Sequence, residues 1–282
     1  MSITTNCRVL EVGKVRRDAG ALFGECPFED WFNKYIAASA EDKKIPEHLL
    51  ISRTKHIPLP VNVLVIQTES ERILVDTGTP AVPVDQCTED WTQSRLRNEL
   101  HTINMTLNDI TKVILTSFDI DHAGGLTRYS RTGALSYAFP DAEVFYHANI
   151  QERQRPRTIP NAKQAVEMLM DNHQHPCWEV TEVAPGITLH PTFGPSLQGC
   201  IVEISRGGDR LLYLGDLCPT AFHVNLSAIP AFDDSPEATY KERLHWIEFA
   251  RKNGYKIMFA HGAQVKAAWI ETTKGGLAVK PA

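Results

Sequence analysis

Short apolar runs rich in β-branched residues recur along this chain, and most end abruptly at a polar residue or a glycine. Runs of this kind are typical of buried β-strands. Residues 61–67 and 72–76, separated by a polar stretch, predict a β-hairpin. Further strands are expected at 112–116, 143–147, 200–204, 210–214 and 256–260. The chain is therefore expected to fold around β-sheets.

Helices are expected between these strands. Residues 92–100 are modestly amphipathic, and the clearest helix runs from Ser235 to Asn253. Ser235 can cap this helix, Pro236 suits its first position, and Gly254 follows its end. The alternation of strands and helices predicts a layered α/β fold.

Two finer predictions concern the faces and insertions of this fold. A stripe of the last helix is predicted to pack against a sheet; its members are Tyr240, Leu244, Ile247 and Arg251. Residues 151–178 show little periodicity and predict an inserted loop or lid. No repeat or Gly/Ser linker divides the sequence, so residues 1–282 are expected to form a single domain.

The composition excludes several classes of function. The net charge of -5 gives no electrostatic reason to bind nucleic acid or an anionic membrane. No apolar run approaches the ~20 residues that span a bilayer, and the start of the chain does not resemble a signal peptide. Six scattered cysteines without a Cys-x-x-Cys pair indicate reduced thiols, so we expect a cytoplasmic protein.

Acidic and histidine side chains follow three of the predicted strands. Asp121 and His122 come after the strand at 112–116, Asp216 after the strand at 210–214, and His261 after the strand at 256–260. Active sites are commonly built from loops at strand ends. The sequence therefore predicts that these four side chains gather at one edge of a sheet.

Residues 117–125, Ser-Phe-Asp-Ile-Asp-His-Ala-Gly-Gly, resemble the signature of the metallo-β-lactamase superfamily, usually His-x-His-x-Asp-His followed by small residues. Supporting matches follow the family's order at 18–24, 74–78, 213–220 and 259–261, with a spacing similar to that of its lactonase-like hydrolases. The resemblance implies an αββα sandwich, in which two mixed β-sheets are flanked by helices.

The family binds two metal ions, and this chain departs from its first site. The positions of the three first-site histidines hold Ser117, Asp119 and Pro195. The resemblance implies that the second site is complete, with ligands Asp121, His122, His261 and the bridging Asp216. This donor set predicts one divalent metal ion, with Zn²⁺ favoured and Fe²⁺ or Mn²⁺ as alternatives.

The implied reaction is hydrolysis of a small ester, lactone or thioester by a hydroxide on this ion, which Asp121 helps to hold. Asp119 is the expected general base or water-orienting group, or else only a hydrogen-bond acceptor. His223 is the expected donor to the oxyanion or leaving group. The partner is a small-molecule substrate, and aromatic residues between Phe23 and Phe32 suggest a homodimer.

Two other functions stay open. Asp121, His122 and His261 also satisfy the two-histidine, one-carboxylate rule of non-haem iron enzymes, which predicts oxygen chemistry. The replaced first-site positions instead favour a non-catalytic or regulatory protein that binds a small ligand in the old pocket. For Ser117, the simplest interpretation is a spacer in place of the missing histidine.

Overall fold

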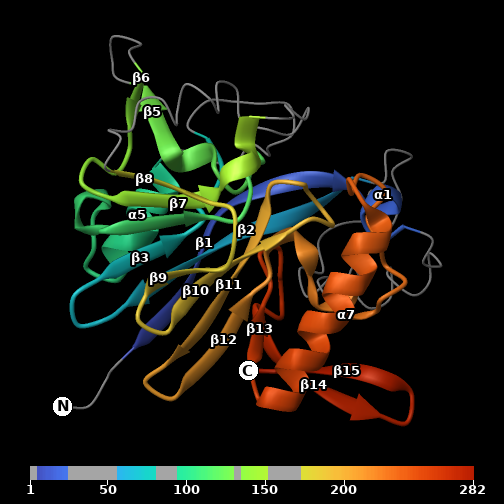
Figure 1. The fold of residues 1–282 in the computed structure, drawn as a ribbon. Coiled ribbons are helices and arrows are strands. Elements are labelled where there is room, and N and C mark those ends of the chain that lie inside the picture. Colours follow the sequence, from blue (N-terminus) through green and yellow to red (C-terminus); the bar gives the residue numbers. More distant parts are fainter. Residues whose placement is uncertain (1–4, 25–55, 81–93, 130–134, 152–172) are drawn as a thin grey trace.

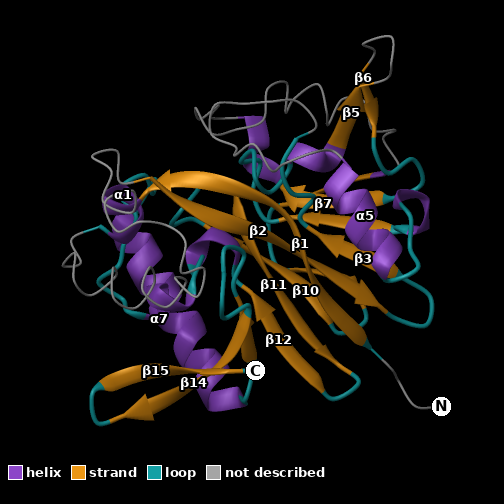
Figure 2. Cartoon of the chain, turned by 180° about the vertical axis from the view of Figure 1, so that it is seen from behind, coloured by secondary structure: helices purple, strands orange, loops and turns teal. Residues whose placement is uncertain are grey.

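Two β-sheets stacked face to face form the body of the protein in this computed structural model (Figure 1). The structure describes residues 5–24, 56–80, 94–129, 135–151 and 173–282. Figure 2 shows the same layers from behind, with the helices on the outside of the sheets. The predicted fold, two mixed β-sheets flanked by helices, is confirmed.

The first sheet contains the predicted hairpin. Its strands, in spatial order, are β1 (Asn6–Asp18), β2 (His56–Gln67), β3 (Arg72–Val75), β4 (Lys112–Leu115), β7 (Glu143–His147) and β8 (Gln174–Cys177). β1, β2 and β3 pair antiparallel, whereas β3, β4, β7 and β8 run parallel. Because β3 and β4 are parallel neighbours, the loops that follow them meet at one edge of the sheet.

The second sheet is formed by the C-terminal half of the chain. Its strands, in spatial order, are β15 (Gly276–Pro281), β14 (Ala267–Thr273), β13 (Lys256–Met258), β12 (Asp209–Tyr213), β11 (Gly199–Arg206), β10 (Ile187–Thr192) and β9 (Thr181–Ala184). β12 and β13 are parallel, and the other neighbours are antiparallel. The loops after β12 and β13 therefore also lie together.

The helices within the described ranges are short except for one. The α-helices there are α1 (Ala19–Phe23), α5 (Ser94–Thr102) and α7 (Pro236–Asn253). Short 3-10 turns occur at η2 (Leu107–Asp109), η3 (Gly124–Leu126), η4 (Ala148–Gln151), η6 (Gly215–Leu217) and η7 (Ala221–Val224). A small hairpin consists of β5 (Thr127–Tyr129) and β6 (Leu135–Tyr137).

Three apolar clusters correspond to the three contacts between four layers. The middle cluster joins the sheets and includes Ile73 and Ile114 from the first and Val202 and Met258 from the second. A second cluster covers the outer face of the first sheet, where α5 packs. The third lies between the second sheet and α7. Burial of β-branched residues in all three explains why the strands read as apolar runs.

Helix α7 has the predicted ends but only part of the predicted buried face, since Ile247 is buried as predicted. Ser235 caps it through a hydrogen bond from the Ala238 backbone, and Gly254 ends it with a left-handed backbone. The prediction that Tyr240 and Leu244 pack against the sheet is wrong, because they are 45% and 36% exposed. The buried face is instead formed by Thr239, Arg243, Ile247 and Ala250. A polar and an arginine side chain take core positions there, which a hydrophobic stripe does not reveal.

The insertion predicted at 151–178 falls mostly in 152–172, outside the described residues. Its last part differs from the prediction, because residues Gln174–Cys177 form strand β8. β8 is an edge strand, and an edge tolerates the proline that argues against a strand in the sequence. Phe28, Trp31 and Phe32, on which the homodimer prediction depends, also lie outside the described residues.

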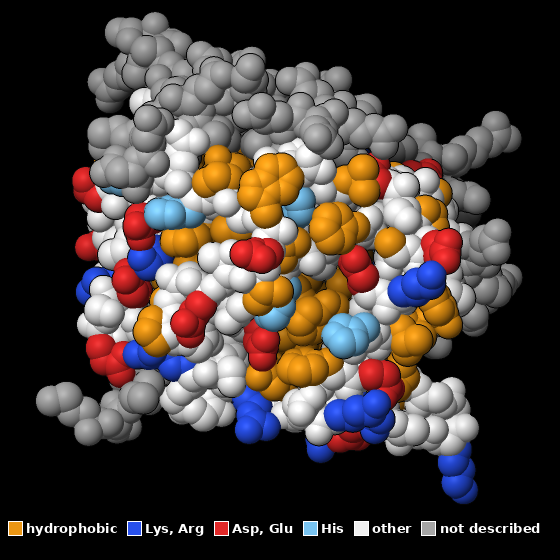
Figure 3. All heavy atoms as spheres, in the orientation of Figure 1, with side chains coloured by type: hydrophobic (Ala, Val, Ile, Leu, Met, Phe, Trp, Pro, Cys, Tyr) orange, Lys and Arg blue, Asp and Glu red, His pale blue; other side chains and the backbone are white. Residues whose placement is uncertain are grey.

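The cysteines, the helices and the surface charges relate to the predictions made from composition. Cys7, Cys177, Cys200 and Cys218 are free thiols in the described part of the chain, as their spacing predicted. None of the helices in the described ranges combines the length and the apolar character needed to cross a bilayer. On the face shown in Figure 3, basic side chains are interspersed with acidic ones.

Candidate metal centre

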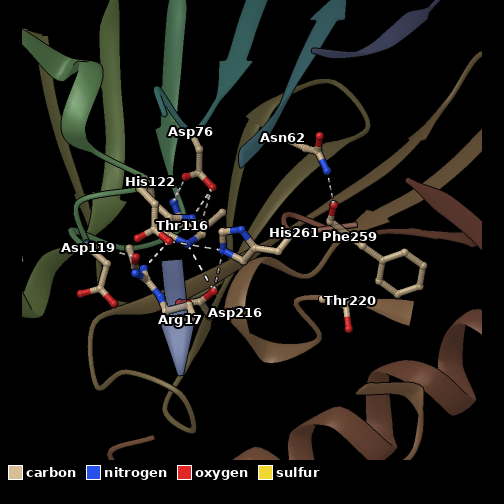
Figure 4. Close-up of polar contacts among 12 residues, drawn as sticks. Arg17, Asn62, Asp76, Thr116, Asp119, His122, Asp216, Thr220, Phe259 and His261 are labelled. Atoms are coloured by element: carbon tan, nitrogen blue, oxygen red, sulfur yellow. Dashed lines mark hydrogen bonds and ion pairs between the residues drawn. The ribbon is translucent and has the colours of Figure 1, made fainter. Parts of the chain in front are cut away.

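Three loops converge where the predicted site residues lie. Asp121 and His122 follow β4, and His261 follows β13. Ligand atoms of these three buried residues all lie within 4.8 Å of one another. Asp216, in the turn after β12, falls outside that group, although its Oδ1 is 3.3 Å from His122 Nε2 and 3.4 Å from His261 Nε2. Figure 4 shows the cluster, to which both sheets contribute.

The orientation of His122 is set by Asp76. His122 Nδ1 lies 2.7 Å from Asp76 Oδ2. A carboxylate accepts, so Nδ1 carries a proton and Nε2 is the ring nitrogen that faces Asp216 and His261. Asp76 is itself held by the Thr116 backbone and hydroxyl, at 2.8 and 2.7 Å, and by the Tyr213 hydroxyl at 2.8 Å. Asp76 thus supports the imidazole and orients its ring.

His261 is oriented in the same way by a carbonyl. Its Nδ1 donates to the Pro60 carbonyl oxygen at 2.8 Å, which leaves Nε2 as the acceptor atom facing Asp121 and Asp216. The loop that carries His261 is clamped to β2 by Asn62. The Asn62 amide nitrogen donates to the carbonyl oxygens of Phe259, at 3.1 Å, and Gly262, at 2.9 Å.

The distances within the cluster fit a metal ion. Two donor atoms bound ~2.0–2.1 Å from a tetrahedral zinc ion lie ~3.3–3.4 Å apart. Nε2 of His122 and Oδ1 of Asp216 are 3.3 Å apart, and Nε2 of His261 is 3.4 Å from both Asp121 Oδ2 and Asp216 Oδ1. His122 Nε2 is also buried without a hydrogen bond. Four converging acceptors at these separations suit a shared cation, so the residues fit a divalent metal ion.

The electrostatics of the pocket point the same way. Burial opposes protonation of His122, but the carboxylates of Asp76 and Asp216 outweigh it and raise the pKa of His122 well above its ordinary value. The pocket therefore attracts positive charge to the Nε2 side of this imidazole. A metal ion bound there satisfies the same carboxylates.

Arg17, near the end of β1, also enters this cluster. Its Nη2 lies 2.5 Å from Asp121 Oδ2, and both side chains are buried. Figure 4 shows the guanidinium group between Asp119 and Asp216. A positively charged side chain thus contacts a predicted metal ligand, a feature that the sequence did not reveal.

The three residues in the first-site positions are not part of this group. Ser117 and Pro195 line a narrow cavity together with Asp216. Asp119 is buried, and its backbone nitrogen donates to Ser117 Oγ at 3.2 Å. Its predicted role in proton transfer stays a prediction.

His223, the predicted proton donor, is completely buried. Its Nδ1 lies 2.8 Å from Thr220 Oγ1, and its Nε2 donates to the Leu22 carbonyl oxygen at 3.1 Å. Burial and the nearby Arg243 lower the pKa of His223 to about 3. A role in catalysis would require it to break one of these bonds, so the geometry instead favours a link between η7 and α1.

Asn62, Tyr213 and Arg17 are the residues of the centre that sequence reasoning missed. Asn62 had a usable signal, since a polar side chain interrupts an otherwise apolar strand and is 1% exposed in the structure. Tyr213 and Arg17 had none, because each lies at the end of a strand where such residues are common.

Replacing Asn62 with alanine is expected to lower the free energy of unfolding by about 2–3 kcal/mol, because two buried hydrogen bonds to carbonyl oxygens are lost. Urea denaturation measures this change. Asn253→Ala removes a comparable bond, to the Phe249 carbonyl oxygen, at the exposed end of α7 and serves as the control. Equal losses of unfolding free energy in the two variants would contradict the proposal that Asn62 holds the His261 loop against β2.

Comparison with known proteins agrees with this geometry. The family model described as "Metallo-beta-lactamase superfamily" matches residues 56–261, well over half of the chain. No significant match is found among curated protein sequences.

Solved structures with the same fold align over nearly the whole chain. A probable metal-dependent hydrolase from Staphylococcus aureus has 24% identity and a TM-score of 0.80, covering 99% of this chain and 97% of its own. A dizinc quorum-quenching lactonase, AidC, has 14% identity and a TM-score of 0.73, covering 99% and 94%. An N-acyl homoserine lactone hydrolase has 20% identity and a TM-score of 0.68, covering 94% and 95%. At these identities the likeness shows the fold.

Proposed function

This chain belongs to the metallo-beta-lactamase superfamily, and on that premise we propose that it is a metal-dependent hydrolase of a small ester, lactone or thioester. The observation that carries the proposal is the shared orientation of two histidines. His122 and His261 each use Nδ1 to bond an acceptor, so that both Nε2 atoms face Asp216. Such tautomer control is typical of metal-binding imidazoles.

His122, His261, Asp121 and Asp216 would hold one divalent ion, for which Zn²⁺ is the favoured identity. A bound ion supplies Lewis acidity and lowers the pKa of a coordinated water from ~16 to ~7. The protein holds the ligands rigidly, because Asp76 and the Asn62 clamp fix them from behind. Asp119 is retained as the proposed water-orienting group, since it follows β4 beside the cluster.

The cavity beside Asp216 is narrow, with a volume of about 10 Å³, which is room for about one water molecule. Ser117 and Pro195, which line it, offer no strong ligand to a second ion. Among the candidate substrates a lactone is favoured, because the lactonases named above share the fold over nearly the full chain.

The purified protein is expected to carry about one equivalent of zinc per chain. Dialysis against a chelator should abolish hydrolysis of a lactone panel and lower the melting temperature, and added Zn²⁺ should restore both. Elemental analysis and thermal unfolding measure these effects. A protein that binds no metal at saturating concentrations would instead support the ligand-binding, non-catalytic alternative.

The oxygenase alternative has one observation in its favour. The close group of one carboxylate and two histidines is also the donor set of non-haem iron enzymes. Asp216, within 3.4 Å of both imidazoles, makes a fourth ligand and leaves fewer open positions for oxygen. Iron content together with substrate-dependent oxygen uptake distinguishes this function from hydrolysis.

A further inference from the structure

Arg17 is placed to act on the metal centre rather than on the surface. Its side chain is 8% exposed, whereas the neighbouring Arg16 points outward. Nη2 of Arg17 bonds Oδ2 of Asp121, and this same oxygen faces His261 Nε2 at 3.4 Å. The guanidinium therefore touches one of the two carboxylate oxygens of Asp121, the one that faces His261.

The charge around this oxygen explains why an arginine is tolerated there. Asp76, Asp119 and Asp121 are all buried, and Asp216 is largely buried beside them. One divalent ion balances two carboxylates, and several buried carboxylates are costly without further positive charge. Ser117 and Pro195 cannot attract a second ion to the adjoining cavity. Arg17 is a fixed cation at the point where additional positive charge is needed.

We propose that Arg17 supplies the second positive charge of this centre, so that it holds a single divalent ion and binds that ion less tightly than an uncharged side chain would allow. This inference rests on the proposed function in taking the cluster as a metal site. Arg17 is a positioning residue here, because it acts through Asp121.

Two effects oppose each other when Arg17 is replaced. Loss of the hydrogen bond frees Asp121, and loss of such a supporting contact typically weakens metal binding by about 10–100-fold. Loss of the guanidinium charge removes repulsion of the ion. At an effective dielectric constant of about 20, the repulsion between a divalent and a univalent cation ~5 Å apart lowers the affinity for the ion by several factors of ten. Relief of this repulsion therefore outweighs the loss of the hydrogen bond.

The test compares Zn²⁺ binding by the full chain and its variants, measured by competition with a chromogenic chelator, together with the melting temperature of each metal-free protein. Arg17→Gln removes the charge but keeps an N–H donor, Arg17→Met removes both, and Arg17→Lys keeps the charge. Arg16→Met, which removes the same charge from an exposed position one residue away, is the matched control.

We expect one equivalent in the wild type, at least about tenfold tighter binding by Arg17→Gln, and little change in Arg17→Lys or Arg16→Met. Metal-free Arg17→Met is expected to melt at a lower temperature than the wild type. Unchanged or weaker binding by Arg17→Gln overturns the inference, and so do two equivalents in the wild type. If neither wild type nor variants bind zinc, the proposed function itself fails, which is a different result from zinc binding that ignores Arg17.

Discussion

Alanine in place of His261 is expected to weaken zinc binding by about 10²–10³-fold. Structural zinc sites bind with about 10–16 kcal/mol in total, so each of four ligands contributes roughly 3 kcal/mol. His261 Nε2 faces both Asp121 and Asp216 at 3.4 Å. Removing it leaves three donors around a cavity open to water.

The measurement is zinc affinity by competition with a chelator, combined with thermal unfolding. Ligand at a hundred times its dissociation constant stabilises a protein by about 2.7 kcal/mol, so zinc should raise the melting temperature of the wild type by several degrees and that of the variant hardly at all. His190→Ala is the matched control, because His190 bonds Glu203 at 3.0 Å away from the cluster. Equal zinc affinity in the wild type and His261→Ala would remove His261 from the site.

The parts of the fold that could be predicted are those that produce a recognisable local pattern in the sequence. The hairpin at 61–67 and 72–76 was visible because both strands bury their side chains in continuous apolar runs. The positions of Asp121, Asp216 and His261 were visible because each follows such a run at a glycine-rich turn. Gly215, for example, has a φ of +51°, a left-handed backbone that favours glycine.

What could not be predicted depends on contacts between distant segments. Arg17 and Asp121 are separated by 104 residues, and nothing in the residues around Arg17 indicates a buried ion pair. Strand β1, which carries Arg17, alternates apolar residues with arginine and glutamate and does not read as buried. Tyr213 bonds Asp76 across 137 residues. Such pairings become visible only once the chain is folded.

The prediction of the buried face of α7 was partly wrong for a related reason. A hydrophobic stripe assumes that buried positions are apolar, but Arg243 is completely buried and takes the centre of that face. It does so because it donates to buried carbonyl oxygens in the connection between β12 and α7.

Replacing Arg243 with methionine is expected to lower the free energy of unfolding by about 3–5 kcal/mol, because two hydrogen bonds from a charged group are lost; this is the largest effect on stability that we anticipate for one side chain. Its Nε donates to the Leu217 carbonyl oxygen and its Nη1 to the Ala228 carbonyl oxygen, both at 2.6 Å. Methionine fills similar volume but leaves both buried acceptors without these donors. Urea denaturation of the metal-free protein measures the loss.

Arg243→Met should also affect zinc binding at the metal centre. Leu217 follows Asp216 within η6, so a loosened turn after β12 displaces the Asp216 carboxylate from the two imidazoles. We therefore expect Arg243→Met to weaken zinc binding as well as stability. Arg251→Met on the same helix breaks a partly exposed ion pair with Glu248 and is expected to cost less than about 0.5 kcal/mol. If Arg243→Met costs no more than this control, buried arginine bonds do not hold α7 and the Asp216 turn together.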